Sequence, residues 1–383
     1  MIAEKLAEVE FETLTPSLLG GYDTGSYSYV LGKDFYEVPR PLAIKGCLRW
    51  WLRVLLAGAL WEAGKSEEEI EKRVGEKVGW IFGTTYPPRS SSASQILLHI
   101  QMLNPSSLEE VQDSIPRMKL LTQGSEYNPK KPSYKKDKRE WRLSCFREGL
   151  KFKLFLYLRP NSKLGESEKE VALWATALYS IFGGIGAMTR RGFGALQLEK
   201  EPSFLEGTTL SKFVDYNQVT SNLVRKAVEE ALESAHKLFG TSWKERREIP
   251  SFPVLARSDV FKTEIREIKK KDPISLLVKL GECTLKETWK NREKRGYRYD
   301  TWILGLPRGM GNTGYTPKKR RASAICLKPL ARNEEDWKVL VYGFLSRDWP
   351  KIEHHSALKS QLVKTTPEEA FRKAWEKVLS LLR

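Results

Sequence analysis

The residues best suited to chemistry form one glycine-rich segment, Gly183–Gly194, with the sequence GGIGAMTRRGFG. Phosphate-binding loops are also glycine-rich, but the Rossmann spacing requires a third Gly where Thr189 stands, and no P-loop Lys-Ser/Thr pair is present. Those loops run from a strand into a helix, whose amino terminus then meets the phosphates. Here the surrounding pattern runs from a helix into a strand. We therefore predict that the glycines let bare backbone approach a long polyanion, while two arginines supply charge. The residues expected to contact RNA in this segment are Gly183, Gly184, Gly186, Arg190, Arg191, Gly192, Phe193 and Gly194.

A second group of basic residues follows four-residue steps. Lys45, Arg49 and Arg53 share one helical face beside the apolar residues Leu48 and Leu52, and this spacing predicts a basic stripe on a helix. A solvated helix face without a partner is the alternative. The arginines of the glycine loop and the charge of the chain favour RNA.

Basic residues also gather in the second half of the chain, in Lys290–Arg298 and Lys318–Arg321. Charge runs of this kind are more often solvated than specific. We expect Arg308, Arg320 and Arg321 to make only secondary RNA contacts.

Catalytic signals are weak. The four histidines, His99, His236, His354 and His355, belong to no metal or nucleophile motif, and the four cysteines form no CxxC pair. We expect no catalytic residue, metal ligand or cofactor. Asp23, in the loop after the first strand, leaves open a metal-dependent endoribonuclease, and a protein-binding scaffold is a third alternative.

Composition agrees with a polyanionic partner. Lys and Arg number 65 and Asp and Glu 48, which gives a formal net charge of +17 over 383 residues. The amino terminus is acidic and lacks a signal-peptide core, and the apolar stretch Leu48–Trp61 is interrupted by arginines and too short to span a bilayer. We expect a soluble cytoplasmic protein with no membrane partner.

Hydrophobic periodicity predicts the elements that position these residues. In the first half, strands are expected at 6–15, 95–102, 150–158 and 193–199, and helices at 41–64, 66–78 and from the capping box Ser167–Glu170 to Gly183. The order strand, helix, strand, strand, helix, strand is that of a ferredoxin-like domain. In the second half, helices are expected at 221–239, 273–293 and 367–382 and strands at 252–265, 302–306, 322–327 and 339–345.

The fold class predicted from this order is α+β, with two ferredoxin-like (RRM-like) domains that carry insertions. Residues 1–200 form the first domain and residues 201–383 a degenerate second domain. The largest insertion contains the basic segment Lys130–Arg142. In this topology the first and third strands are neighbours, so Glu8, Glu10 and Glu12 should pair with Lys151 and Lys153. These lysines then need no RNA, and we expect RNA on the side of the loop and the first helix.

A glycine loop between the second helix and fourth strand of such a domain resembles the hallmark of the repeat-associated mysterious proteins (RAMPs) of CRISPR systems. Further segments are similar to the family of first-numbered subunits of the type III-B Cmr module. These segments are Thr13–Pro16, Gly20–Gly21, Pro41–Arg53 (PLAIKGCLRWWLR), Ile81–Gly83, Leu304–Arg308 and Arg320–Ser323. Ala43 departs from the Ser expected in the helix motif.

This resemblance implies a non-catalytic RNA-binding subunit of an antiviral ribonucleoprotein. It implies a place at the end of the complex that holds the 3′ part of the guide RNA, and a role in capturing target RNA. The implied partners are single-stranded guide and target RNA and the other Cmr subunits, of which a different one slices the target.

Overall fold

The computed structural model describes residues 3–19, 39–84, 92–104, 108–111, 143–284, 301–305, 315–317, 321–349, 352–354 and 365–383. Several residues singled out above lie outside these ranges: Gly20, Gly21, Asp23, Lys130–Arg142, Lys290–Arg298, Arg308, Arg320 and His355.

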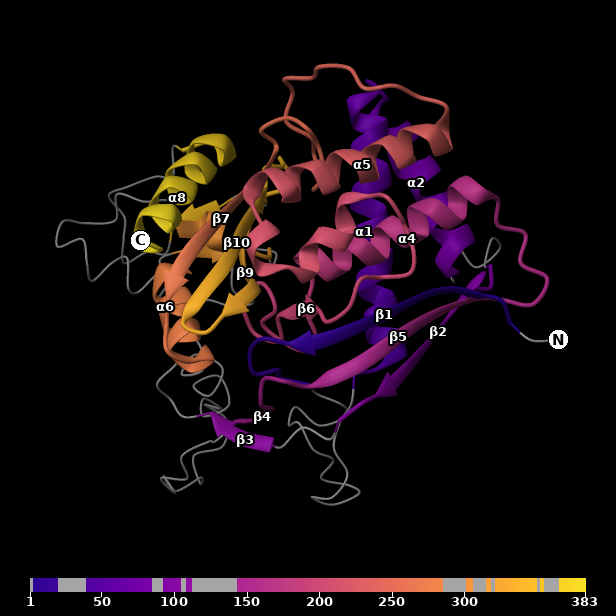
Figure 1. The fold of residues 1–383 in the computed structure, drawn as a ribbon. Helices are drawn as coiled ribbons and strands as arrows, with labels where there is room; N and C mark the ends of the chain where they lie inside the picture. Colours follow the sequence, from indigo (N-terminus) through magenta and orange to yellow (C-terminus); the bar gives the residue numbers. More distant parts are fainter. Residues whose placement is uncertain are drawn as a thin grey trace, which may run out of the picture.

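The first half of the chain alternates strands with long helices (Figure 1). Its elements are β1 (Lys5–Thr13), α1 (Pro41–Glu62), α2 (Glu67–Phe82), β2 (Ile96–Met102), β3 (Leu108–Val111), β4 (Leu143–Phe146), β5 (Lys151–Leu158), α4 (Glu166–Phe182) and β6 (Leu196–Leu198). Pro41 occupies the first turn of α1, where its missing N–H costs nothing, and Gly183 ends α4.

The second half begins with short helical turns and a helix. Its elements are η2 (Thr209–Val214), η3 (Tyr216–Gln218), α5 (Ser221–Phe239), β7 (Phe261–Lys269), α6 (Pro273–Thr284), η4 (Thr301–Leu304), β8 (Tyr315–Pro317), β9 (Ile325–Asn333), β10 (Asp336–Phe344), β11 (Ile352–His354) and α8 (Pro367–Leu381). Figure 1 shows the two termini at opposite ends of the molecule.

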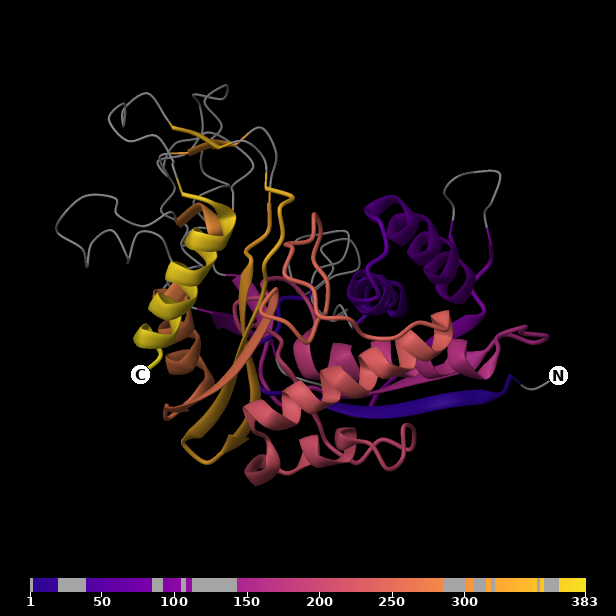
Figure 2. The ribbon, with the colours of Figure 1, turned by 90° about the horizontal axis from the view of Figure 1, so that it is seen from above.

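The larger sheet is antiparallel, with the order β2-β5-β1-β6. Val9 and Phe11 point into the core, and the glutamates that alternate with them point to the other face. Helices α1 and α4 pack on the core face and on each other, and α2 and α5 pack against this pair, as Figure 2 shows from above. The predicted neighbourhood of the first and third strands, β1 and β5, is confirmed.

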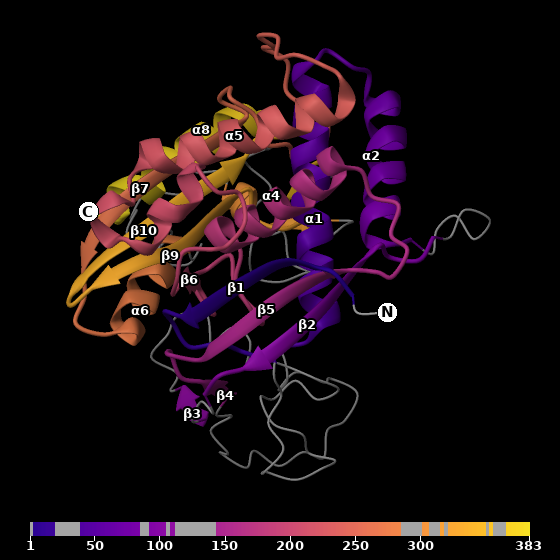
Figure 3. The ribbon, with the colours of Figure 1, turned by 45° about the vertical axis from the view of Figure 1, so that its right-hand side comes forward.

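A three-stranded antiparallel sheet, β7-β10-β9, forms the centre of the second half. Figure 3 shows it beyond the β6 edge of the larger sheet, with β9 on the side next to β6 and α6 and α8 nearby. The architecture is thus a mixture of helices and antiparallel sheets, as the sequence predicted. In the part of the chain that the structure describes, no helix is long and apolar enough to cross a bilayer.

The two halves share one apolar core. It includes Phe11 and Leu52 in the first half and Val339 and Phe371 in the second. Polar contacts also join the two halves. The hydroxyl of Tyr342 donates to the Phe182 carbonyl at 2.9 Å, and buried Lys328 donates to the carbonyl of Ser180. Burial lowers the pKa of Lys328 well below its usual value. The proposed division near residue 200 therefore does not separate two independent cores.

Several sequence predictions were wrong in detail. The segment predicted as a strand at 302–306 is the 3-10 helix η4, and the strand predicted at 252–265 starts only at Phe261. The N-cap of α4 is Gly165, whose N–H donates to the Glu168 carboxylate. Ser167, predicted to begin the capping box, therefore lies inside the helix. In the first two cases long-range contacts override the local pattern, since Phe261 packs on Phe344 and Trp302 on Trp349.

Candidate RNA interface

The basic stripe predicted on α1 lies where the helix leaves the core. Leu48 and Leu52 are fully buried, while Lys45 and Arg49 are half-buried and Arg53 is exposed. Within the described ranges, none of the three cations has a carboxylate within ion-pair distance. Burial and then Arg49 lower the pKa of Lys45, and burial and then Arg53 lower the pKa of Arg49. Three like charges therefore repel one another along one face, and an incoming anion would relieve that repulsion.

The glycine loop is held in place by the segment that follows β1. The N–H of Ala187 donates to the Leu18 carbonyl at 2.9 Å, and the N–H of Gly194 donates to the Pro16 carbonyl at 2.9 Å. Thr15 adds a buried hydroxyl that donates to the Gly192 carbonyl at 2.6 Å and accepts from Ala195. The loop is therefore a packed part of the fold.

This packing explains the glycines and corrects the role predicted for them. A Cβ on Gly194 would lie 2.0 Å from the Ile185 carbonyl oxygen, and one on Gly184 would lie 2.7 Å from the Gly194 carbonyl oxygen. Gly192 and Gly194 also have φ of +92° and +55°, which side chains other than glycine rarely adopt. These three glycines are buried and let the chain approach itself, so they do not present open backbone along the surface.

Two more loop glycines have the same kind of constraint. A Cβ on Gly183 would meet the Tyr179 side chain at 2.4 Å, and one on Gly186 would meet the Leu18 carbonyl oxygen at 2.4 Å. Gly186 is exposed and Gly183 is half-buried. Of the glycines predicted to contact RNA, these two keep surface that a ligand can reach.

Arg191 and Phe193 are also not surface residues, which corrects a second prediction. Arg191 is 6% exposed, and its guanidinium donates to the carbonyls of Leu304 at 2.9 Å and Ile325 at 3.2 Å. Burial lowers the pKa of Arg191 to about 10. Phe193 is 1% exposed and packs with Leu18 and neighbouring apolar residues. Both residues anchor the loop, Arg191 to the second half and Phe193 to the core.

Arg190 has the opposite orientation to Arg191. Its main-chain carbonyl accepts from the N–H of Leu327 on β9 at 3.1 Å, which fixes the backbone while its side chain is exposed. The guanidinium lies 6.0 Å from the ring centre of Trp50 on α1. Trp50 is half-buried and is held edge-on by Trp51 at 4.7 Å and Phe344 at 5.6 Å. Arg190 is thus the loop cation that remains accessible to RNA.

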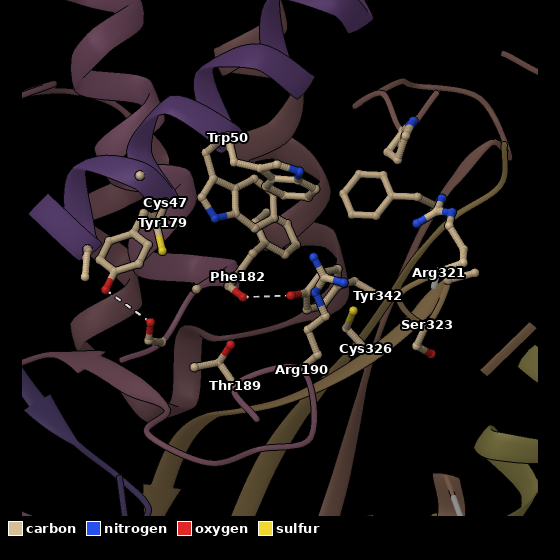
Figure 4. A pocket seen from close by; sticks show the side chains of 18 residues that line it. Cys47, Trp50, Tyr179, Phe182, Thr189, Arg190, Arg321, Ser323, Cys326 and Tyr342 are labelled. Atoms are coloured by element: carbon tan, nitrogen blue, oxygen red, sulfur yellow. Dashed lines mark hydrogen bonds between the residues drawn. The ribbon is translucent and has the colours of Figure 1, made fainter. Parts of the chain in front are cut away.

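A pocket of about 250 Å³ opens between α1, the glycine loop and the β9–β10 sheet, and we call it the seam pocket (Figure 4). Figure 4 shows Arg190 between Trp50 and Tyr342, with Arg321 approaching from the other side. Its lining residues are Ala43, Gly46, Cys47, Trp50, Trp51, Tyr179, Phe182, Gly183, Gly184, Thr189, Arg190, Pro253, Arg321, Ser323, Ala324, Cys326, Tyr342 and Phe344.

Arg321 is the one second-half arginine of the predicted set that the described ranges contain. Its guanidinium donates to Asp348 at 2.9 Å and to the hydroxyl of Ser346 at 3.2 Å, and it lies 5.0 Å from the Trp349 ring. Asp348 partly neutralises this charge, and the side chain is 17% exposed. Arg308 and Arg320 lie outside the described residues, so their RNA contacts stay predictions.

The outer face of the larger sheet is neutralised internally, as predicted. Lys153 pairs with Glu8 at 2.8 Å and with Glu10 at 3.7 Å, and Lys151 pairs with Glu12 at 3.5 Å. The hydrogen bond from Lys153 lowers the pKa of Glu8 and raises that of the lysine itself. These lysines are satisfied without RNA.

His236 has structural surroundings within the described ranges. His236 is 6% exposed, with its Nε2 3.2 Å from Glu62 and its Nδ1 3.0 Å from the Thr241 hydroxyl. His99 lies on β2, 5.8 Å from the Phe155 ring, and His354 lies on β11. In the same ranges no three His, Cys, Asp or Glu residues gather as a metal site. Asp23 and His355 lie outside them.

The seam pocket is the feature that sequence reasoning missed. Trp50 lies within the motif Pro41–Arg53, and no local pattern connects it with Tyr342 on β10, almost 300 residues away. The structure brings them together through the second-half sheet, which covers the carboxyl end of α4.

The chain is similar to known proteins along nearly its whole length. The chain is 24% identical over 358 residues to the CRISPR system Cmr subunit Cmr1-1 of Pyrococcus furiosus, and the alignment covers 91% of this chain and 90% of that protein. The crystal structure of apo Cmr1 from P. furiosus is similar in fold, with a TM-score of 0.51, 17% identity, and coverage of 93% and 91%.

A second fold match is a chain in the cryo-EM structure of the type III-B Cmr-beta bound to cognate target RNA. Its TM-score is 0.60 at 17% identity, and coverage is 99% of this chain and 100% of that one. Residues 10–197, which include the α1 stripe and the whole glycine loop, match the RAMP superfamily. The first half of the chain thus matches the RAMP superfamily, and a Cmr1 relative aligns along nearly the whole chain.

Proposed function

We propose that this chain is a non-catalytic, RNA-binding subunit of a type III-B Cmr ribonucleoprotein. The observation that carries the proposal is the basic stripe of α1, whose three cations lack acidic partners within the described ranges. Burial and then the neighbouring arginine lower the pKa of Lys45 and of Arg49. Arg190 adds a fourth accessible cation to the adjoining loop. Unpaired cations in a row suit a phosphate backbone, which attracts them without regard to base sequence.

The similar proteins support RNA as the polyanion that binds here. A relative aligned over nine-tenths of this chain is a Cmr subunit, and a fold neighbour belongs to a complex bound to target RNA. By the same resemblance, the partners are guide and target single-stranded RNA and the other Cmr subunits, at the end that holds the 3′ part of the guide. The chain would work in the cytoplasm, where guide and target meet.

The proposal includes two finer points on fold and chemistry. The first half is a ferredoxin-like unit, supported by its strand order β2-β5-β1-β6. The second half from about residue 201 is a degenerate unit of the same kind, supported by the order β7, α6, β9, β10, α8 of its longer elements after α5. Target cleavage belongs to another subunit, since the accessible residues described above offer charge and stacking surface but no acid–base pair.

The test is the salt dependence of RNA binding by the full chain and by the triple variant Lys45→Ala, Arg49→Ala, Arg53→Ala. The wild-type affinity for single-stranded RNA should fall steeply with salt. Removing three phosphate contacts should reduce the slope of log affinity against log salt by about 2, at about 0.7 for each contact on a single strand. Unchanged affinity and slope in the variant would contradict the role of α1 and favour a protein-binding scaffold.

A further inference from the structure

The seam pocket combines an aromatic floor with a cationic rim. Trp50, Phe182, Tyr342 and Phe344 form interlocked edge-on and tilted ring contacts, with centroids 5.1–6.2 Å apart along the chain of rings. Each ring is therefore held in one orientation before any ligand arrives, which reduces the entropy lost on binding. Such a surface suits a flat, unsaturated group.

The charged residues that line the seam pocket are all positive. Two arginines, Arg190 and Arg321, line it, and none of its 18 lining residues is acidic. Arg321 is already paired with Asp348, whereas Arg190 faces the Trp50 ring with no described carboxylate near it. The Thr189 hydroxyl makes no hydrogen bond to another described residue and can serve a polar group of the ligand. The site thus favours a flat group that carries an anion.

We propose that the seam pocket binds one nucleotide of a single-stranded RNA, with the base against Trp50 and Arg190 and the phosphate at the arginines. Indole rings and guanidinium planes are the surfaces on which proteins stack unpaired bases. A volume of about 250 Å³ is small beside the range of about 300–1,000 Å³ typical of ligand pockets, which suits a single base. This inference rests on the RNA-binding function proposed above.

The position of the pocket on α1 connects it with the basic stripe. Gly46, Cys47 and Trp50 occupy the helical face next to Arg49 and Arg53, one turn or less away along the helix. A strand whose phosphates follow the stripe therefore passes the mouth of the pocket. A base inserted there contacts α1, the glycine loop and the second-half sheet together, so it would fix the register of the RNA at the seam between the halves.

The native chain contains a reporter for this proposal. Cys47 lines the pocket and is exposed, while Cys145, Cys283 and Cys326 are buried. Alkylation of the folded full chain, followed by mass spectrometry, therefore reads the accessibility of the pocket without any substitution. The pocket partly shields the Cys47 thiol from water and so raises its pKa, although the residue as a whole is exposed. The reaction is therefore run at mildly alkaline pH, where more thiolate is present.

Three ligands separate the contributions of base, backbone and free nucleotide. They are a single-stranded ribo-oligonucleotide, an oligonucleotide of equal length that is abasic at every position, and a nucleoside monophosphate. We expect both oligonucleotides to bind with the same salt slope, because they carry the same phosphates. The oligonucleotide with bases should bind about 5- to 150-fold more tightly, as stacking energies of about 1–3 kcal/mol per base imply. It should also protect Cys47, and the abasic one should not.

Two variants locate the effect. Trp50→Ala should remove most of the difference between the two oligonucleotides, while Trp243→Ala, at an indole that is 51% exposed and outside the pocket lining, should leave it unchanged. Circular dichroism shows whether Trp50→Ala still folds, and the comparison on the native chain stands without that variant.

The possible failures are distinguishable. Equal affinity and equal Cys47 protection with both oligonucleotides would overturn the pocket proposal and leave the proposed RNA-binding function intact. Protection by the monophosphate but not by RNA would overturn it in favour of a free-nucleotide site. If neither oligonucleotide binds, the proposed function fails and this inference fails with it.

Discussion

Replacing Arg191 by Ala should destabilise the fold, whereas replacing its neighbour Arg190 should leave stability unchanged. Arg191 is buried and donates to the carbonyls of Leu304 and Ile325, so it fastens the glycine loop to the second half. Arg190 is exposed, and substitutions at exposed positions usually change stability by about 0.5 kcal/mol or less. The two arginines are adjacent in sequence, which makes each variant the matched control for the other.

The expected loss can be worked out from the contacts of Arg191. The Leu304 carbonyl loses its donor, which costs about 2 kcal/mol, while the Ile325 carbonyl keeps the Ser323 hydroxyl as a donor at 2.6 Å and loses about 1 kcal/mol. The three methylenes of the side chain contribute about 2 kcal/mol of apolar burial. The burial penalty of the guanidinium disappears with the side chain, and the lowering of its pKa to about 10 corresponds to about 3 kcal/mol in the other direction. The net loss is about 2 kcal/mol.

Urea-induced unfolding measures this difference. Tryptophan fluorescence and circular dichroism follow the transition, and the free energy of unfolding is compared among the wild type, Arg190→Ala and Arg191→Ala. Arg191→Lys provides a further comparison, because one ammonium can keep a cation at the site but cannot reproduce the guanidinium fork to two carbonyls. Its stability should fall between those of the wild type and Arg191→Ala.

RNA binding gives the complementary result: Arg190→Ala should fold normally and bind RNA more weakly. Two outcomes would refute the reasoning. If Arg191→Ala were as stable as Arg190→Ala, the two carbonyl contacts would not hold the loop in place. If Arg191→Ala kept full stability but lost RNA affinity, Arg191 would be a surface contact, as the sequence first indicated.

Three further predictions concern the sheet face, the loop glycines and catalysis. Lys153→Ala should leave RNA affinity unchanged. Because Lys153 lowers the pKa of Glu8, this variant should lose a little stability at neutral pH. The difference from wild type should disappear as the pH falls through the lowered pKa of Glu8 in acid unfolding measurements. Gly194→Ala should cost several kcal/mol of unfolding free energy, while Gly207→Ala, which also has a positive φ but no atom within 4 Å of the added Cβ, should cost about 1 kcal/mol; equal losses would show that close packing does not constrain the loop. The purified chain with magnesium or manganese should leave RNA intact in a gel assay, and copurifying cleavage abolished by Asp23→Ala would promote the endoribonuclease alternative.

The sequence by itself determined the features that repeat with a regular period. Alternation in β1 and β5 and three- and four-residue steps in α1 and α4 predicted these elements to within a few residues, because each buries one face against a single core. Once the strand order followed, the pairing of the β1 glutamates with Lys151 and Lys153 followed too, since neighbouring strands place facing residues in contact. The α1 stripe was predictable for the same reason.

Only the tertiary structure decided the roles of residues in the glycine loop. Arg190 and Arg191 are adjacent arginines in a segment without a periodic pattern. Arg190 is exposed at the surface, whereas Arg191 is buried and binds two carbonyls. The difference arises because η4 and β9, more than 100 residues later, place two carbonyls beside Arg191. The seam pocket has the same origin: α1, the loop and β10 meet there only because the two halves share one core. A local pattern reports which face of an element is buried, but not which distant backbone groups will meet it.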